Sequence, residues 1–334
     1  MTAAPNLPEE LWSHVVGTLA GAESIVLACH VAPDGDALGS MLAAGLALRA
    51  LDRPVFCSFG DEPFRVPRAY AFLPGQDLLV PPAAIPGSPE VLVTFDTSSR
   101  DRLGRLAELV DSAGEVIVVD HHVRGDGFGR TRLVDDAAAA TAVIVAELVD
   151  RLGVVLNADI ACCLYTGLTT DTGSFKFVST TPAVHELAAR LLATGIRHEL
   201  IARAVWDTNS FGCIGLLGTA LSRARLEPEA AAGHGLVWTH TTAADLVRFG
   251  VGLDEIEGLI DLVRTTAEAD VAVVCKGDRD GGFKVSARSK GAVDVGGVCA
   301  GLGGGGHRFA AGYTSADGLD ATMDGLRQAL AAAR

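Results

Sequence analysis

The chain has 334 residues, of which 49% are hydrophobic and 5% aromatic, and this length is enough for two domains with separate cores. No apolar stretch approaches the ~20 residues of a membrane span, and no basic segment followed by an apolar one stands near Met1. The formal net charge of −14 argues against a protein that coats long nucleic acid, because such proteins bind phosphates through basic stripes. We therefore expect a globular protein that has neither a membrane nor long nucleic acid as a partner.

The first part of the chain alternates apolar, strand-like runs with helical patterns. Strands are expected at 24–30, 54–59, 91–96 and 115–120. Helices are expected at 37–51, 102–112, 139–152, 157–169, 183–194 and 197–206. Such alternation predicts an α/β fold with a doubly wound, mainly parallel sheet.

Ionisable side chains end or follow three of these strands. These are His30, Asp96 and His121. Asp34 and Asp36 follow His30 closely, and Asp171 follows a predicted helix, so that the full set has six members. A single aspartate after a strand more often caps a helix or is solvated. The carboxyl ends of neighbouring parallel strands, however, converge on one crevice, where four carboxylates would repel each other unless cations neutralised them. Oxygen ligands with two imidazoles suit a pair of divalent ions that promotes attack on phosphorus, so the set predicts a two-metal phosphoesterase.

The second part of the chain, after a boundary between 206 and 232, predicts a smaller mixed α/β domain. Strands are expected at 235–240, 270–276, 282–288 and 309–314, and helices at 242–249, 254–266, 294–302 and 317–332. Basic side chains outnumber acidic ones within 276–308, beside a run of four glycines. This local positive charge suits a small anionic substrate that carries a few phosphates.

The order of the motifs resembles that of the DHH phosphoesterases with a C-terminal DHH-associated domain. In the first domain the motifs are His30-x-x-x-Asp34-x-Asp36, Asp96, Asp120-His121-His122 and Thr170-Asp171-Thr172-Gly173. In the second domain they are Ser286-x-Arg288-Ser289 and the run Gly303, Gly304, Gly305, Gly306 and His307. The length of the chain and the surroundings of each motif are most similar to the nanoRNase and pAp-phosphatase branch of that family.

This resemblance implies a hydrolase that converts short oligoribonucleotides and dinucleotides to mononucleotides and pAp to AMP, with linear or cyclic di-AMP as further substrates. It implies two divalent metal ions as cofactors, with Mn²⁺ favoured over Mg²⁺ or Co²⁺, and attack by a hydroxide that the two metals activate. One ion would be held by His30, Asp34 and Asp96. The other would be held by Asp36, Asp96, His121 and Asp171, so that Asp96 bridges the pair.

The resemblance also assigns roles to residues that are not metal ligands. His122 is expected to contact the substrate phosphate and assist the leaving oxygen, and Asp120 to orient an imidazole. The expected substrate-binding residues are Arg288, Ser286, Gly303, Gly304, Gly305, Gly306 and His307. A glycine run alone is more often a flexible loop, but its pairing with an arginine that can fork two donors onto a phosphate favours binding.

We expect three segments: a catalytic domain at 1–206 that binds two metals, a connecting helix and turn at 207–232, and a substrate-binding domain at 233–334. The active site would lie in the cleft between the two domains. Seven cysteines without CxxC spacing predict a reducing cytoplasm. The resemblance implies a homodimer, for which the apolar helices at 139–152 and 157–169 could supply the face. Two alternatives stay open: an inorganic pyrophosphatase of related architecture, and a sensor that binds dinucleotides without hydrolysing them.

Overall fold

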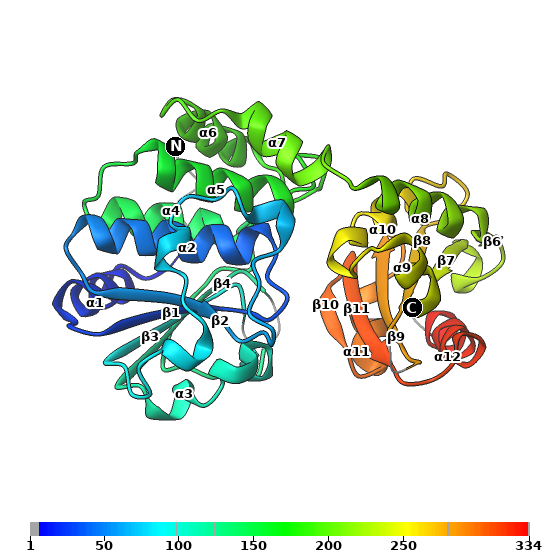
Figure 1. Cartoon of the computed structure of the whole chain (residues 1–334), viewed down its shortest axis with the longest axis horizontal. Coiled ribbons are helices and arrows are strands. Elements are labelled where there is room, and N and C mark those ends of the chain that lie inside the picture. Colours follow the sequence, from blue (N-terminus) through cyan, green and yellow to red (C-terminus); the bar gives the residue numbers. More distant parts are fainter. Residues whose placement is uncertain (1–6, 98, 123–124, 279–280, 333–334) are drawn as a thin grey trace. The chain divides into compact units, whose positions relative to one another are not determined.

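The computed structural model describes residues 7–97, 99–122, 125–278 and 281–332 and divides the chain into two compact units, Met1–Thr208 and Asn209–Arg334. The first unit contains a five-stranded parallel sheet and the second a six-stranded mixed sheet (Figure 1). The predicted α/β fold, with a mainly parallel sheet followed by a smaller mixed one, is therefore confirmed. The assignment of metal binding to 1–206, of a connector to 207–232 and of substrate binding to 233–334 concerns roles and stays a prediction.

The parallel sheet of the first unit has the strand order β2-β1-β3-β4-β5. Its strands are β1 (Ile25–Cys29), β2 (Val55–Phe59), β3 (Val91–Phe95), β4 (Glu115–Asp120) and β5 (Thr131–Val134). Side chains alternate between the two faces of a strand, and both faces of this sheet are apolar. Ile25 and Leu27 pack in the cluster under the long helices, whereas Val26 and Ala28 pack on the opposite side.

One face of this sheet is covered by helices α2 (Gly35–Ala50) and α4 (Thr141–Arg151), and helix α5 (Ala158–Asp171) packs on these two (Figure 1). The other face is covered by the 3₁₀ segment Arg100–Leu106 and by α3 (Leu109–Ser112). Helices α1 (Glu9–Gly21), α6 (Pro182–Leu192) and α7 (His198–Trp206) complete the unit. The apolar side chains of α4 and α5 are buried within this unit, so these helices do not supply the dimer face that we expected.

Helix α2 is enclosed on all sides: every residue from Gly35 to Leu48 is buried. It crosses α5 at very short range, because a Cβ at Gly39 would lie 2.4 Å from the carbonyl oxygen of Cys163. Glycine at this crossing lets the two backbones approach. The close crossing brings the carboxyl end of α5, at Asp171, to the same edge of the sheet as the start of α2.

Two expectations for the first unit were wrong or incomplete. The predicted helix at 102–112 is a 3₁₀ segment followed by one short helix, because Gly104 adopts φ 54 and breaks the turn. Strand β5 was not predicted, since it has only four residues, of which two are partly exposed. Strands that short lack a strong alternation signal.

The sheet of the second unit has the order β10-β11-β9-β8-β7-β6. Its strands are β6 (Arg225–Glu227), β7 (Leu236–Thr241), β8 (Val271–Gly277), β9 (Phe283–Ser289), β10 (Gly305–His307) and β11 (Ala310–Ser315). Its helices are α8 (Phe211–Ser222), α9 (Ala243–Phe249), α10 (Leu259–Val263), α11 (Val295–Gly301) and α12 (Leu319–Ala332). The short edge strands β6 and β10 were not predicted, and the helix expected at 254–266 is reduced to a 3₁₀ turn and α10.

The two faces of this second sheet are covered unequally. Phe283, Val285 and Ala287 of β9 are buried in the core that α11 and α12 complete. On the opposite face, α8 and α10 pack over β7 and β8. The residues of β9 that face the same way, Lys284, Ser286 and Arg288, are exposed or partly exposed. This half of the face is accessible, and we call it the open face.

Among the described residues, no helix combines the length and the apolar character that crossing a bilayer requires.

Candidate active site

The predicted ligands of the first unit lie together at the carboxyl ends of β1, β3 and β4. They form three groups in which the candidate ligand atoms lie within 4.8 Å of one another. The groups are His30, Asp34 and Asp96; Asp36, His121 and Asp171; and Asp96, Asp120 and His122. The structure therefore brings together all eight residues that the sequence singled out in this unit.

The first group forms where β1 ends and α2 begins. Asp34 is the N-cap of α2, and its Oδ1 accepts from the amides of Asp36 and Ala37 at 3.1 and 3.0 Å. Its other oxygen, Oδ2, lies 3.8 Å from Nε2 of His30. Asp34 thus caps helix α2 with Oδ1 and contributes Oδ2 to the cluster.

The second group joins three elements. Asp36 lies in the first turn of α2, His121 directly follows β4, and Asp171 is the last residue of α5. The Nε2 atom of His121 lies 3.0 Å from Asp171 Oδ2 and 3.9 Å from Asp36 Oδ2. Asp36 and His121 are buried, while the side chain of Asp171 is 23% exposed, which leaves a solvent-accessible side to the group.

Asp96 lies between these two groups and faces both. Its Oδ2 is 3.4 Å from Nε2 of His30, and its Oδ1 is 3.5 Å from Nε2 of His121. The residue follows β3 directly with φ 57, a left-handed conformation that aspartate adopts more readily than most residues. A carboxylate with one oxygen toward each group has the arrangement required of a bridging ligand.

The two imidazoles have the orientation expected of metal-binding histidines. Nδ1 of His30 lies 2.8 Å from the carbonyl oxygen of Val31, and Nδ1 of His121 lies 3.2 Å from that of Ala138. Since a carbonyl can only accept, both Nδ1 atoms carry the proton. Nε2 is therefore the atom that each ring directs toward the carboxylates and would offer to a cation, as in metal sites where a second partner fixes the orientation of the imidazole.

The electrostatics of the cluster favour a cation. Burial, together with the charges of Asp96 and Asp171, raises the pKa of Asp36 well above its ordinary value. Burial lowers the pKa of His30, but the neighbouring carboxylates of Asp34 and Asp96 outweigh it and raise that pKa to about 10. The pKa of His121 is also well above its usual range, because Asp171 and Asp96 outweigh the effect of burial. Without metal, the site would take up protons; divalent cations fit the same oxygen and imidazole donors.

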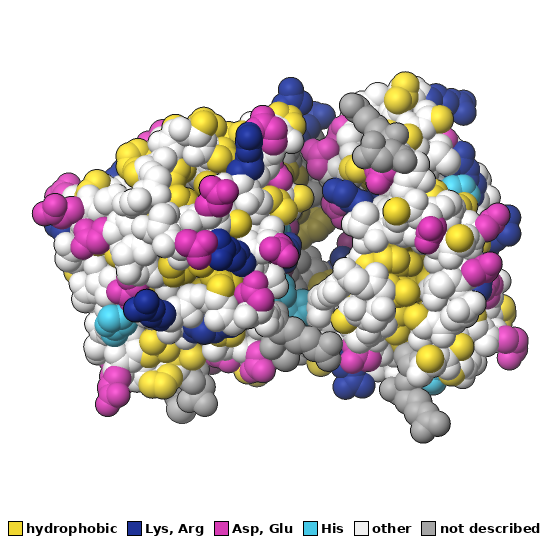
Figure 2. All heavy atoms as spheres, turned by 90° about the horizontal axis from the view of Figure 1, so that it is seen from below, with side chains coloured by type: hydrophobic (Ala, Val, Ile, Leu, Met, Phe, Trp, Pro, Cys, Tyr) yellow, Lys and Arg dark blue, Asp and Glu magenta, His cyan; other side chains and the backbone are white. Residues whose placement is uncertain are grey.

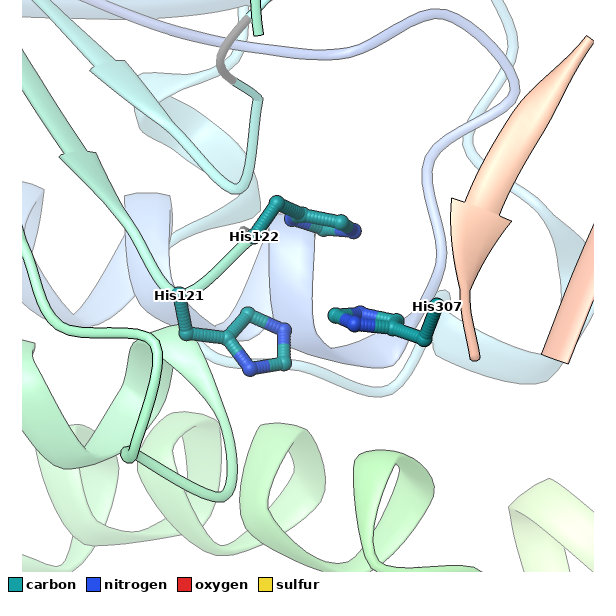
Figure 3. A group of neighbouring side chains, drawn as sticks. All are labelled: His121, His122 and His307. Atoms are coloured by element: carbon teal, nitrogen blue, oxygen red, sulfur yellow. The ribbon is translucent and has the colours of Figure 1, made fainter. Parts of the chain in front are cut away.

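Asp120 and His122 form a separate unit beside the ligands. The buried Asp120 Oδ1 accepts from the amides of His121 and His122, at 2.8 and 3.2 Å, and from Nδ1 of His122 at 2.7 Å. Figure 3 shows the side chains of His121 and His122 leaving the chain just after β4, and their ring centroids are 4.8 Å apart. Asp120 thus fixes both the backbone turn and the His122 ring. His307, also drawn in Figure 3, ends β10 in the second unit and is described with that unit.

Several residues that support the site were not predicted. Thr141, at the start of α4, donates its amide to Asp36 and its hydroxyl to Asp96. Ser40, one turn along α2, donates to Asp36 at 3.1 Å. The charge of Arg102, in the 3₁₀ segment after β3, acts on both His30 and Asp34. The one sequence signal for Thr141 was that the residue before it, Ala140, has no side chain that could cap the helix.

In the second unit, strand register places four of the predicted substrate-binding residues on the open face: Arg288, Ser286, Gly305 and His307. Gly306 lies in the row of Ala311 and Ala287, which faces the core, and Gly303 and Gly304 precede the strand. His307, Ala310 and Arg288 form one row across β10, β11 and β9. Gly305, Gly312 and Ser286 form the next row. Directly paired residues point to the same face, so Arg288 and His307 flank a floor of small residues.

The backbone of the second unit requires glycine in the run 303–306, independently of any ligand. A Cβ at Gly304 would lie 2.1 Å from the carbonyl oxygen of Gly312, and Gly306 adopts φ 135. Glycine is therefore required for β10 to pair so closely with β11. The residues from Gly305 to His307 form a short strand rather than a free loop, so anion binding by these amides stays a prediction.

These observations define a class: a two-unit α/β protein with a carboxylate and imidazole centre, suited to divalent cations, at the ends of parallel strands. Comparison with known proteins gives the family. Residues 24–168 match the model of the DHH family, N-terminal domain, and residues 240–333 match that of the DHHA1 domain. A protein of Thermus thermophilus described as a bifunctional oligoribonuclease and PAP phosphatase NrnA is 36% identical over 89% of this chain and 85% of its own length. One of the same description from Bacillus subtilis is 25% identical over 90% of this chain and 92% of its own.

Solved structures share the fold. An exopolyphosphatase-related protein from Bacteroides fragilis superposes with a TM-score of 0.88 and 24% identity, covering 99% of this chain and 97% of that one. RecJ of Thermus thermophilus in complex with Mn²⁺ gives a TM-score of 0.54 and 14% identity, over 98% of this chain and 55% of its own. The chain belongs to the DHH family of phosphoesterases, and it is a hydrolase.

Proposed function

We propose that this protein is a metal-dependent phosphoesterase that degrades short oligoribonucleotides and dinucleotides to mononucleotides and removes a phosphate from pAp. The observation that carries this proposal is Asp96, with one oxygen toward His30 and the other toward His121. The proposal is supported by the two relatives described as oligoribonuclease and PAP phosphatase. Linear and cyclic di-AMP are further proposed substrates.

Two divalent cations fit the donor set of the first unit. His30, Asp34 and Asp96 would hold one, and Asp36, Asp96, His121 and Asp171 would hold the other. When bound, such ions supply activation of water and neutralisation of the charge that develops on phosphorus. We favour Mn²⁺, with Mg²⁺ and Co²⁺ as the alternatives; the imidazole ligands that accompany the carboxylates disfavour Mg²⁺, which prefers oxygen ligands.

The side chains that are not ligands have proposed roles of their own. Asp120 accepts the Nδ1 proton of His122, so Nε2 is the ring atom that can donate to a phosphate or to the leaving oxygen. Hydrogen bonding to Asp120 outweighs burial and raises the pKa of His122, which keeps a proton available near neutral pH. We propose that His122 is the general acid and that Asp120 orients it.

The open face of the second unit is proposed to bind the phosphates and sugar of the substrate through Arg288, Ser286 and His307. Its rows span three strands, which matches a substrate of one to a few nucleotides. A long nucleic acid is not proposed as a partner. On the face of the molecule in Figure 2, the described Lys and Arg side chains are scattered among Asp and Glu and form no continuous stripe.

Two proposals concern the setting of the enzyme. We propose a cytoplasmic protein, because all seven cysteines are unpaired and six of them are buried. We also propose a homodimer; Phe211 and Ile214, which are 92% and 53% exposed on α8, supply apolar surface for a second copy. Light scattering after size exclusion measures the mass, and a monomer at micromolar concentration would contradict the dimer.

The test of the proposed function is product release, with and without Mn²⁺, from pAp, linear diadenylate, cyclic di-AMP, a five-nucleotide RNA, a thirty-nucleotide RNA and pyrophosphate. We expect mononucleotides from the short substrates and phosphate from pAp, weak action on the long RNA, and loss of all activity in EDTA. Turnover of pyrophosphate alone would identify a pyrophosphatase instead. Tight dinucleotide binding without turnover would identify a sensor.

A further inference from the structure

Helix α4 begins at Thr141 without a capping side chain of its own. Its N-cap residue is Ala140, which has no side-chain acceptor. Asp36 of α2 takes that place: its Oδ2 accepts from the amide of Thr141 at 2.6 Å and its Oδ1 from that of Ala142 at 2.9 Å. The first amides of a helix carry partial positive charge and need an acceptor, so α4 and Asp36 satisfy each other.

The hydrogen bonds to Asp36 determine which of its oxygens has room for another partner. A carboxylate oxygen has about two acceptor positions. Oδ1 already accepts from Ala142 and from the hydroxyl of Ser40, whereas among the residues that the structure describes Oδ2 accepts from Thr141 alone. Oδ2 is also the oxygen that faces His121, at 3.9 Å. Asp36 therefore has one acceptor position left, on the side of the cluster.

The side chain of Thr141 forms a hydrogen bond with a second carboxylate of the cluster, that of Asp96. Its hydroxyl donates to Asp96 Oδ1 at 3.0 Å, and Thr141 is fully buried. Oδ1 is the oxygen toward His121, while Oδ2 faces His30. One residue thus holds two carboxylates, that of Asp36 on helix α2 through its amide and that of Asp96 after strand β3 through its hydroxyl.

We propose that Thr141 is a positioning residue for the metal centre: it fixes Asp36 and Asp96 so that each presents a defined oxygen to a divalent cation. This inference rests on the proposed metal site. Outer hydrogen bonds of this kind orient metal ligands, and their loss typically weakens metal binding about 10- to 100-fold. Thr141 does not touch the substrate in this proposal, so it is not a catalytic residue.

The test compares Thr141→Val with Thr141→Ser. The valine variant keeps the shape and the amide but loses the bond to Asp96, and the serine variant keeps the hydroxyl. Calorimetric titration of the EDTA-stripped protein with Mn²⁺ should show affinity about 10-fold or more weaker in Thr141→Val. Thr141→Ser should bind Mn²⁺ with nearly wild-type affinity.

The matched control is Thr166→Val in α5. Thr166 is equally buried, and its hydroxyl donates to the carbonyl of Cys162 at 2.8 Å, away from both carboxylates. It should bind Mn²⁺ like the wild type. Thermal unfolding in EDTA reports the purely structural cost of each substitution. Should Thr141→Val fail to fold, Thr141→Ala removes the same hydroxyl without placing a methyl group against Asp96.

The outcomes separate this inference from the proposed function. Equal Mn²⁺ affinity in wild type and Thr141→Val, with only a lower unfolding temperature, would overturn the positioning role and leave the metal site intact. An equal loss of affinity in Thr166→Val would show a general effect of buried hydroxyls and would also overturn it. A wild type that binds no Mn²⁺ would reject the metal site itself.

Discussion

The two units both bury charged side chains, but they balance the charge in different ways. In the second unit, the buried Asp245 is paired with Arg223, and the buried Lys276 with Glu257 at 2.6 Å. In the first unit, no ion pair with Lys or Arg is recorded for Asp36 or Asp96 among the described residues; their partners are imidazoles, hydroxyls and backbone amides. The buried charges of the second unit are neutralised by side chains of that unit, whereas the buried carboxylates of the first unit form a site that bound cations would neutralise.

The strongest test of this difference is Asp96→Asn. The amide keeps the shape and can still accept from Thr141, but it removes the negative charge that faces both groups. We expect turnover of pAp at saturating Mn²⁺ to fall by about 1000-fold, the upper range for loss of a key electrostatic group. Circular dichroism should show an unchanged fold. More than a tenth of wild-type turnover would contradict the bridging role of Asp96.

A smaller effect is expected from Gly167→Ala, which tests how tightly α5 must approach α2. The added Cβ would lie 2.6 Å from Asp36 Oδ1 and 3.0 Å from the Cβ of Ala142. Asp36 would have to move by a fraction of an ångström or more, and displacements of that order at a reacting centre cost about 100-fold. We expect kcat/KM for pAp to fall by about that factor.

The control for this substitution is Gly17→Ala in α1 of the same unit, where a Cβ would meet no atom within 4 Å. It should leave activity unchanged. If both variants kept wild-type kcat/KM, the close helix crossing would not be needed to hold Asp36.

These two residues also show how far the sequence alone could reach. Asp96 was predictable, because a carboxylate directly after an apolar strand lies at a known edge of a parallel sheet. The role of Gly167 was not, since it depends on the distance between two helices that are far apart in sequence. Thr141 was missed for the same reason: its partners are 105 and 45 positions away. Sequence patterns locate strand ends, but they do not give the packing that brings supporting side chains to them.

In the second unit, too, the sequence revealed the motifs but not the packing that brings them together. The pairing of Arg288 with the glycine run was visible as two motifs, but the row His307–Ala310–Arg288 depends on strand register. Strand β10 itself was hidden, because a glycine run has no strand propensity. Its existence depends on close pairing with β11, which only the folded sheet supplies.

A third prediction concerns the open face. It distinguishes specific binding of a substrate phosphate by Arg288 from long-range attraction of the anionic substrate to positive charge. Arg288→Ala should raise the KM for pAp about 10-fold with little change in kcat, as expected for a charge-assisted bond made equally in ground and transition states. Lys284 lies on the same strand and the same face, four residues away, and is exposed. Lys284→Ala should change KM much less. Equal effects of the two substitutions would indicate long-range attraction rather than a binding site at Arg288.

The smallest effect is expected where charge is already balanced, and it concerns stability rather than activity. Asp245 accepts from both terminal nitrogens of Arg223 and from the amide and hydroxyl of Thr242 at 2.8 Å. The hydrogen bonds from Arg223 hold the pKa of Asp245 well below its ordinary value, which outweighs the opposing effect of burial. The ionised carboxylate therefore stabilises the fold above about pH 4, and this stabilisation is lost as the pH falls below that value toward the folded-state pKa.

Asp245→Asn should accordingly lower the free energy of unfolding at pH 7 by about 1.5–3 kcal/mol, the range for hydrogen bonds to a charged group. The difference from wild type, measured by urea unfolding, should shrink when the pH is lowered from 7 to 3, because Asp245 then binds a proton in the unfolded wild type but not yet in the folded one. Asp77→Asn, which removes the exposed partner of Arg49, should change stability little at either pH. If Asp245→Asn were equally destabilising at both pH values, its cost would come from shape and not from charge, and the contrast between a self-neutralised unit and a cation-dependent one would lose its clearest support.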